Sequence, residues 1–129
     1  MLAVRIFLGL CALAWLPYGL FCLANPGSLA ETAGVEATSA TGRIELRAMY
    51  GGLQAAIGAL ALAGALRPSL APHALLALGS VAAGLGVSRL ASAANAGEFL
   101  PYTVMALALE WTMLVFAFAF FRRVKPAGV

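Results

Sequence analysis

Apolar residues fill four long stretches of the chain, and short segments rich in Gly, Pro, Asn or charged residues separate them. A helix needs about 20 mostly apolar residues to cross a hydrocarbon core of roughly 30 Å. The pattern predicts an all-α integral membrane protein, a four-helix bundle that forms one transmembrane domain over residues 1–129. The spans are expected at about residues 3–24, 43–66, 71–94 and 99–121.

Prolines and turn residues mark the limits of these stretches. The second stretch stops at Arg67-Pro68, because proline cannot continue the helical hydrogen bonds. Residues 25–42 form the longest connection, an outer loop long enough to carry function or partial disorder.

A cleavable signal peptide is the alternative interpretation of the first apolar stretch. The apolar run of about 18 residues exceeds the 7 to 15 residues of a signal-peptide core. We therefore expect this stretch to be retained as a helix.

The composition favours the membrane and excludes other classes of protein. The chain is 63% hydrophobic and 10% charged, whereas soluble domains are roughly 45 to 50% apolar and 25% charged. The net charge of +3 does not indicate nucleic acid binding, because the largest basic cluster, Arg122, Arg123 and Lys125, directly follows an apolar helix. The predicted partner is the lipid bilayer, with no nucleic acid.

The basic residues divide unequally between the two ends of the predicted bundle. Five lie at one end, namely Arg5, Arg67, Arg122, Arg123 and Lys125. Three lie towards the other end, namely Arg43, Arg47 and Arg89. Because cytoplasmic ends carry the excess of Lys and Arg, both termini are predicted to be cytoplasmic.

Several polar side chains lie inside the predicted spans, where an ionisable group costs at least about 2.5 to 3.5 kcal/mol. Glu110 is the clearest, since it falls near the middle of the fourth span. Arg47, Tyr50 and Gln54 follow a helical spacing of three and seven residues, which places them on one face. Together with Arg89 and Tyr18 they predict an outer-half polar pocket with the two arginines at its mouth and Glu110 at its floor.

Three roles are open for Glu110. It can hold the helices in register by bonding to Gln54 or Tyr50 or by pairing with an arginine. It can bind a polar group beneath an anionic headgroup or carboxylate that Arg47 and Arg89 clamp. It can also be the coupling carboxylate of a small proton-driven transporter, although no internal repeat is visible.

The cysteines and the lone histidine predict no metal site. Cys11 and Cys22 are eleven residues apart on one helix, or about 16 Å, which is too far for a disulfide. His73 is far from both in the sequence, and no Cys-x-x-Cys spacing occurs. The sequence also contains no cofactor motif, phosphate loop or nucleophile with its base, so we expect no cofactor and leave open whether the protein is an enzyme.

Small residues recur on the second and third spans, where they mark contact faces, because helices in lipid associate by close backbone packing. They are Gly51, Gly52, Ala55, Gly58, Gly79, Ala82, Gly84 and Gly86. Such faces serve packing within the bundle, and a homo-oligomer assembled through them is also open.

The motif Glu45-Leu46-Arg47-Ala48-Met49-Tyr50-Gly51-Gly52 resembles the hallmark of a family of small four-helix bacterial membrane proteins, catalogued only as a domain of unknown function. Gly86–Ser92 and Glu110 are similar to that family's third-helix motif and fourth-helix acid. An Asp-Gly turn, usual in the family after the third helix, is replaced here by Asn95–Glu98. The resemblance implies the fold and a multi-pass location in the bacterial cytoplasmic (inner) membrane, and it carries no known activity.

The function expected from these observations is binding of a lipid or small amphiphile in the outer-half pocket. The alternatives are a structural or accessory subunit of a membrane complex and a small proton-coupled transporter.

Overall fold

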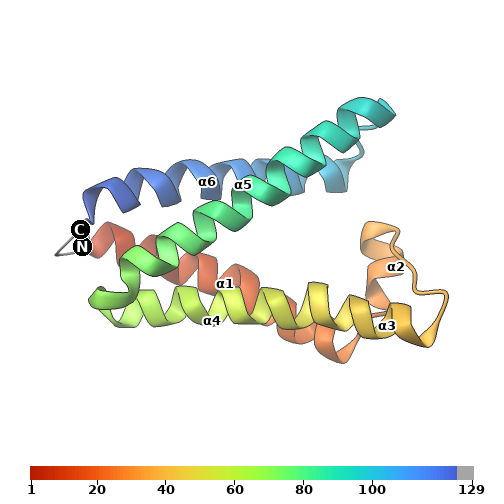
Figure 1. Cartoon of the computed structure of the whole chain (residues 1–129), viewed down its shortest axis with the longest axis horizontal. Helices are drawn as coiled ribbons and strands as arrows, with labels where there is room; N and C mark the ends of the chain where they lie inside the picture. Colours follow the sequence, from red (N-terminus) through yellow and green to blue (C-terminus); the bar gives the residue numbers. More distant parts are fainter. Residues whose placement is uncertain (125–129) are drawn as a thin grey trace.

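The computed structural model describes residues 1–124 and contains only helices over that range. Four segments are long and apolar enough to cross a membrane (Figure 1). These are α1 (Leu2–Ala24), Ala40–Leu66, Pro68–Ala96 and α6 (Pro101–Arg123). The prediction of an all-helical protein with four membrane-capable helices is confirmed for this part of the chain. Lys125, counted above among the basic residues, lies outside the described residues.

The two middle spans are each built from consecutive helical pieces. The second consists of α3 (Ala40–Leu46), the π-helical η1 (Arg47–Gly52) and α4 (Leu53–Leu66). The third consists of the 3₁₀-helical η2 (Pro68–Leu70) and α5 (Ala71–Ala96). The six π-helical residues inside this span were not predicted, because the residue spacings used for the prediction were those of an α-helix.

The helix ends have local causes. The second span begins at Ala40 because the Ser39 hydroxyl accepts a hydrogen bond from the Gly42 backbone N–H at 3.0 Å. The third ends where Gly97 adopts a left-handed φ of 68°. The fourth begins at Pro101, since a residue before proline, here the extended Leu100, is kept out of the helical region.

The 25–42 connection contains helix as well as loop. Helix α2 (Ser28–Ala33) lies within it and ends at Gly34, which has a φ of 67°. Leu29 of α2 is 1% exposed, so it anchors the segment. The interpretation of this segment as an outer loop therefore omits a short helix that a buried leucine holds in place.

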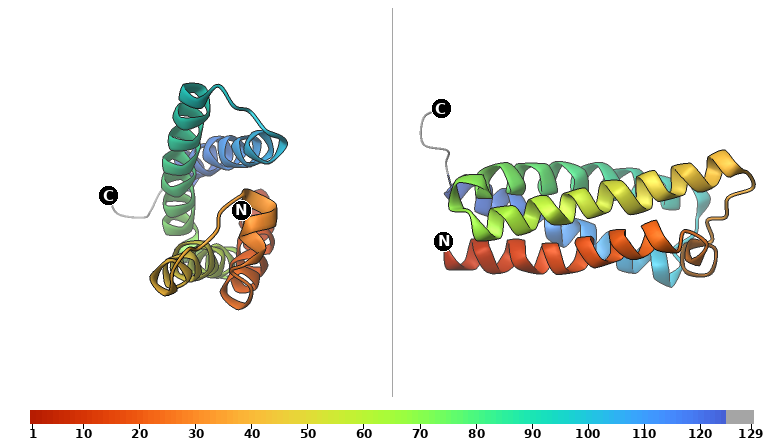
Figure 2. Two further views of the ribbon diagram at one scale, coloured as in Figure 1. Left: turned by 90° about the vertical axis from the view of Figure 1, so that its right-hand side faces the viewer. Right: turned by 90° about the horizontal axis from the view of Figure 1, so that it is seen from below.

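The long helices form two antiparallel pairs, α1 with α4 and α5 with α6, and α4 also packs against α5 (Figures 1 and 2). Helix α1 begins and α6 ends at the same end of the bundle, here called the terminal end. The opposite end carries the turn 97–100 and is called the turn end. Towards the turn end α5 leans away from α4, so the two pairs diverge (Figure 2).

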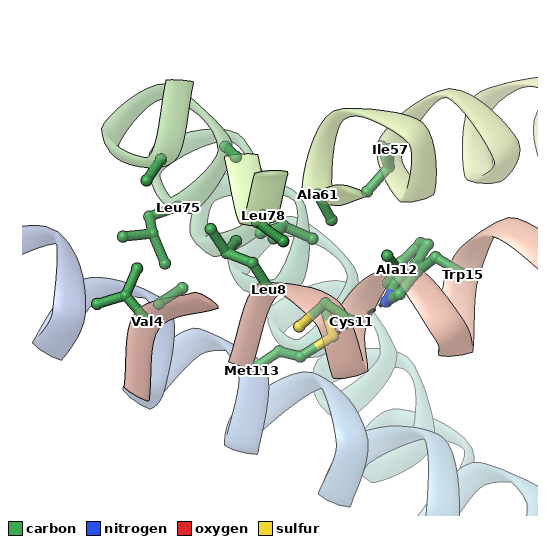
Figure 3. Close-up of a cluster of buried hydrophobic side chains, with 14 of the residues drawn as sticks. Val4, Leu8, Cys11, Ala12, Trp15, Ile57, Ala61, Leu75, Leu78 and Met113 are labelled. Carbon is green, nitrogen blue, oxygen red and sulfur yellow. Dashed lines mark hydrogen bonds between the residues drawn. The ribbon is translucent and has the colours of Figure 1, made fainter. Parts of the chain in front are cut away.

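The apolar core fills the terminal half of the bundle (Figure 3). Leu8 of α1 and Leu75 and Leu78 of α5 are its fully buried large side chains. The indole N–H of Trp15 points to the thioether sulfur of Met113 at 3.0 Å, which joins α1 to α6 across this core. The remaining buried members come from all four spans: Val4, Cys11, Ala12, Ile57, Ala61, Ala65, Ala71, Ala74, Ala82 and Ala117. Glu110, a buried charged residue, lies outside this core and nearer the turn end.

Glycines let α1 and the second span pack backbone to backbone. A Cβ atom on Gly19 would meet the backbone of Ala55 and, at 2.8 Å, the carbonyl oxygen of Gly51. One on Gly58 would lie 2.7 Å from the Cα of Leu16. The predicted small-residue faces thus pack inside the chain here, and assembly of a homo-oligomer stays a prediction.

Candidate functional site

A bidentate ion pair joins α5 to α6 in the middle of the bundle. Arg89 Nε donates to both carboxylate oxygens of Glu110, at 3.0 and 3.1 Å, and Arg89 Nη2 donates to Oε1 at 2.8 Å. Glu110 is 4% exposed, whereas the Arg89 side chain is 30% exposed. Of the partners open to Glu110 from the sequence, the structure therefore selects an arginine, and that arginine is Arg89.

Helix direction brings these two side chains together. Glu110 follows Pro101 by nine residues, so it lies about 14 Å along α6 from the turn end. Arg89 precedes Ala96 by seven residues, so its backbone is only about 10 Å from the turn end of α5. Side chains lean towards the N-terminus of their helix, and these helices are antiparallel. Arg89 therefore reaches deeper into the bundle while Glu110 leans up to meet it.

The ion pair gives the Arg89 guanidinium and the Glu110 carboxylate hydrogen-bond partners, whereas either charge alone in lipid would cost free energy. Among residues 1–124, no buried side-chain nitrogen or oxygen lacks a hydrogen-bond partner. Planar guanidinium and carboxylate groups in fork geometry form one of the stronger charge-assisted contacts in proteins. The pair can thus fix the register of α5 against α6, whatever else it does.

Tyrosines from the second and fourth spans lie near this ion pair. Tyr50 of η1 and Tyr102 of α6 lie close enough to Arg89 to interact with its charge. Tyr18 of α1 neighbours Tyr102 and Cys22. Tyr18 and Tyr50 were predicted as site residues, but Tyr102 was missed. Eight residues separate Tyr102 from Glu110, about 80° of helical rotation, so the periodicity did not place them on one stripe.

Arg47 does not join the site as the sequence analysis expected. Its Nε donates at 3.2 Å to the carbonyl of Leu23, in the last turn of α1. The predicted alignment of Arg47 with Tyr50 and Gln54 assumed α-helical spacing, whereas Arg47–Gly52 is π-helical and turns less per residue. Gln54 is half-buried and does not line the groove described below. The two-arginine clamp is therefore absent from this structure.

A second arginine makes the reciprocal contact at the terminal end. Arg5 of α1 donates from Nε to the carbonyl of Ala65, next to the last residue of α4, at 2.9 Å. The last four carbonyls of a helix lack partners inside it, and a cation there also favours the helix dipole. The first and second spans thus each supply an arginine, Arg5 of α1 and Arg47 of η1, that caps the end of the other span.

The Arg47→Gln variant is expected to lower the free energy of unfolding by about 1 kcal/mol, because it removes a charged cap from α1. It is expected to leave unchanged any small molecule bound between α5 and α6, since Arg47 does not line the groove between these helices. Unfolding in mixed micelles, followed by circular dichroism, measures the first effect. Arg43→Gln, at an exposed arginine of α3, is the control, and equal losses in both variants would contradict the capping role.

A groove of about 470 Å³ opens beside the ion pair, between α5 and α6 at the turn end. It is called the polar groove here. Hydroxyl and charged groups line one part of it, and Leu85 and Leu100 line another. Its polar residues are Ser88, Arg89, Ser92, Glu98 and Thr103, and its small ones are Gly84, Ala93 and Ala96. Of the predicted site residues only Arg89 lines this groove, because the sequence did not reveal that α5 and α6 would pair around it.

Arg89 retains hydrogen-bonding capacity towards this groove. A guanidinium has five N–H donors, and within residues 1–124 Glu110 engages only those on Nε and Nη2. The Nη1 donors can serve an oxygen acceptor of a ligand. Glu110 neutralises the charge, so the site suits a polar but not strongly charged group. Residues 1–124 hold no group of three His, Cys, Asp or Glu side chains that could bind a metal ion.

Comparison with known proteins identifies a family. A family model described as "Domain of unknown function (DUF4345)" matches residues 3–121. No curated protein and no solved structure gives a significant match.

Proposed function

The chain belongs to the DUF4345 family, and from its geometry we propose that it is a multi-pass membrane protein that binds a lipid or other small amphiphile in the polar groove. The observation that carries the proposal is the position of Arg89. Its guanidinium is fixed by Glu110 and lines a groove whose other walls combine hydroxyl groups with leucines. Binding sites for small ligands combine apolar walls with a few fixed polar groups.

The groove suits an amphiphile better than a fully polar solute. A headgroup with ester, carbonyl or hydroxyl oxygens can accept hydrogen bonds from Ser88, Arg89 and Ser92. Leu85 and Leu100 can contact a hydrocarbon tail that leaves the groove towards the lipid. A neutral or zwitterionic headgroup is favoured, because Glu110 already compensates the charge of Arg89.

The membrane and orientation are part of the same proposal. The terminal end carries four arginines, namely Arg5, Arg67, Arg122 and Arg123. Three arginines lie towards the turn end, namely Arg43, Arg47 and Arg89, together with Glu31, Glu36, Glu45 and Glu98. The excess of arginine supports a cytoplasmic terminal end, so the polar groove would open to the outer leaflet. The similarity of residues 45–52 to a bacterial motif supports the bacterial cytoplasmic membrane as the location.

The proposal is tested with a substitution that places a larger side chain in the polar groove. A Cβ on Gly84 meets nothing within 4 Å, and Gly84 lines the polar groove, so Gly84→Leu is the variant chosen to reduce the volume of this groove. Native mass spectrometry of the protein purified in detergent is expected to show a bound small molecule in the wild type and its loss in Gly84→Leu. Gly9→Leu is the matched control, because a Cβ on Gly9 also meets nothing within 4 Å and Gly9 does not line the polar groove.

A structural or accessory subunit is the second candidate. The observation that favours it is the complete engagement of the Glu110 carboxylate by Arg89, which suffices to hold α5 on α6. This candidate predicts no adduct that distinguishes the wild type and Gly9→Leu from Gly84→Leu. A proton-coupled transporter with Glu110 as its coupling group stays a prediction.

A further inference from the structure

A second groove, of about 450 Å³, runs between α1 and α6 in the terminal half of the bundle and is called the apolar groove here. Its walls are almost entirely hydrocarbon and include Phe7, Phe116 and Phe120. Cys11 and Met113 form part of its floor, which is also the edge of the core (Figure 3). The Phe7 ring lies 6.1 and 5.5 Å from the rings of Phe116 and Phe120, so the two walls meet at this point. Elsewhere α1 and α6 contact each other only sparsely, so the rest of the groove is open to the lipid.

The length of the apolar groove matches one leaflet of a bilayer. It extends from Ala3 to Ala14 on α1 and from Leu109 to Phe120 on α6, which is eleven helical steps on each helix. At 1.5 Å per residue this is about 16 Å, half of a hydrocarbon core of roughly 30 Å. A helix from a second copy would cross the whole core and would need a seam of twice this length. An acyl chain that enters from one membrane surface reaches only to the bilayer midplane, so a groove of this length can hold it.

Positive charge lies at the mouth of this groove. Arg122 and Arg123 end α6 and are exposed, one turn past the last wall residue, Phe120. The guanidinium carbon of Arg123 lies 6.0 Å from the centre of the Phe120 ring. A phosphate bonded to Arg123 would therefore lie near the end of a chain that occupies the groove beside Phe120. Zwitterionic and anionic lipids share the acyl chain, but only an anionic headgroup retains a net charge for two arginines.

We propose that the apolar groove binds one acyl chain of an anionic phospholipid whose phosphate contacts Arg122 and Arg123. The site lies at the opposite end of the bundle from the polar groove and differs from it in the headgroup charge that it selects. It does not depend on the function proposed above.

Native mass spectrometry with equal amounts of phosphatidylglycerol and phosphatidylcholine of the same acyl chains tests this site. The wild type is expected to retain phosphatidylglycerol preferentially, and Arg122→Gln with Arg123→Gln to reduce that preference up to about 25-fold, since each arginine contributes roughly fivefold. Ala14→Leu, which fills the deep end of the groove, is expected to weaken both lipids. Arg43→Gln and Gly9→Leu are the charge and volume controls and should retain the wild-type preference.

Equal retention of the two lipids by the wild type would overturn the proposal. An effect of Arg43→Gln as large as that of the double arginine variant would also overturn it, because it would show attraction to net charge rather than a site. A lipid-free dimer that Ala14→Leu dissociates would assign the groove to a second copy of the chain. If the double arginine variant loses phosphatidylglycerol but keeps the adduct of the polar groove, the two grooves bind independently.

Discussion

Replacing Arg89 by Met is expected to lower the free energy of unfolding by about 3 to 5 kcal/mol, because it leaves the carboxylate of Glu110 buried without its partner. Glu110→Leu is expected to cost less, since Arg89 is partly exposed and can extend towards the interface. The double variant should cost less than Arg89→Met alone, because it removes both charges together. Reversible unfolding in mixed micelles gives all three values and the coupling energy.

The matched control for this cycle is Arg43→Met, at an exposed arginine of α3, which is expected to change stability by less than about 0.5 kcal/mol. If the stability losses of Arg89→Met and Glu110→Leu simply add in the double variant, the two side chains are not energetically coupled. This result would mean that the bidentate contact in the bundle contributes no specific stabilisation to the packing of α5 on α6.

The second large effect is expected at the glycine contacts between α1 and the second span. Gly19→Ala and Gly58→Ala should each lower stability by about 1 to 3 kcal/mol or more, because each new methyl group meets backbone atoms that cannot move aside. The two helices must separate to accept it, which also weakens the arginine caps at their ends. Unfolding in mixed micelles measures the loss.

Gly9→Ala separates this packing effect from the loss of a glycine as such. Gly9 lies on the same helix as Gly19, but a Cβ there meets nothing within 4 Å. Alanine is the better helix former, by up to about 1 kcal/mol, so Gly9→Ala should be neutral or stabilising. A loss at Gly9 equal to that at Gly19 would show that close approach of α1 is not what the glycines provide.

The number and class of the helices were predictable because length and apolarity are local properties. Long apolar stretches such as residues 102–121 can satisfy their backbone groups in lipid only as helices. The helix within residues 25–42 was missed because Leu29 is held by tertiary burial, which a short window of sequence does not reveal.

The composition of the candidate site was predictable only in part, since it depends on how the helices rotate against one another. Glu110 and Arg89 were recognised because charges inside a span are costly, and the structure pairs them. Arg47 was assigned to the site on α-helical spacing that η1 does not follow. Tyr102 was missed because it approaches Arg89 from a neighbouring helix, a proximity that no spacing within one helix can predict.

The central claim is that the polar groove beside Arg89 and Glu110 holds a ligand. Native mass spectrometry of the wild type, Gly84→Leu and Gly9→Leu, purified in parallel, tests it most directly. A discrete adduct is predicted on the wild type and on Gly9→Leu that Gly84→Leu lacks, whatever phospholipid all three proteins retain in the apolar groove. Survival of this adduct in Gly84→Leu would contradict binding in the polar groove, and its absence from all three proteins would favour a purely structural ion pair.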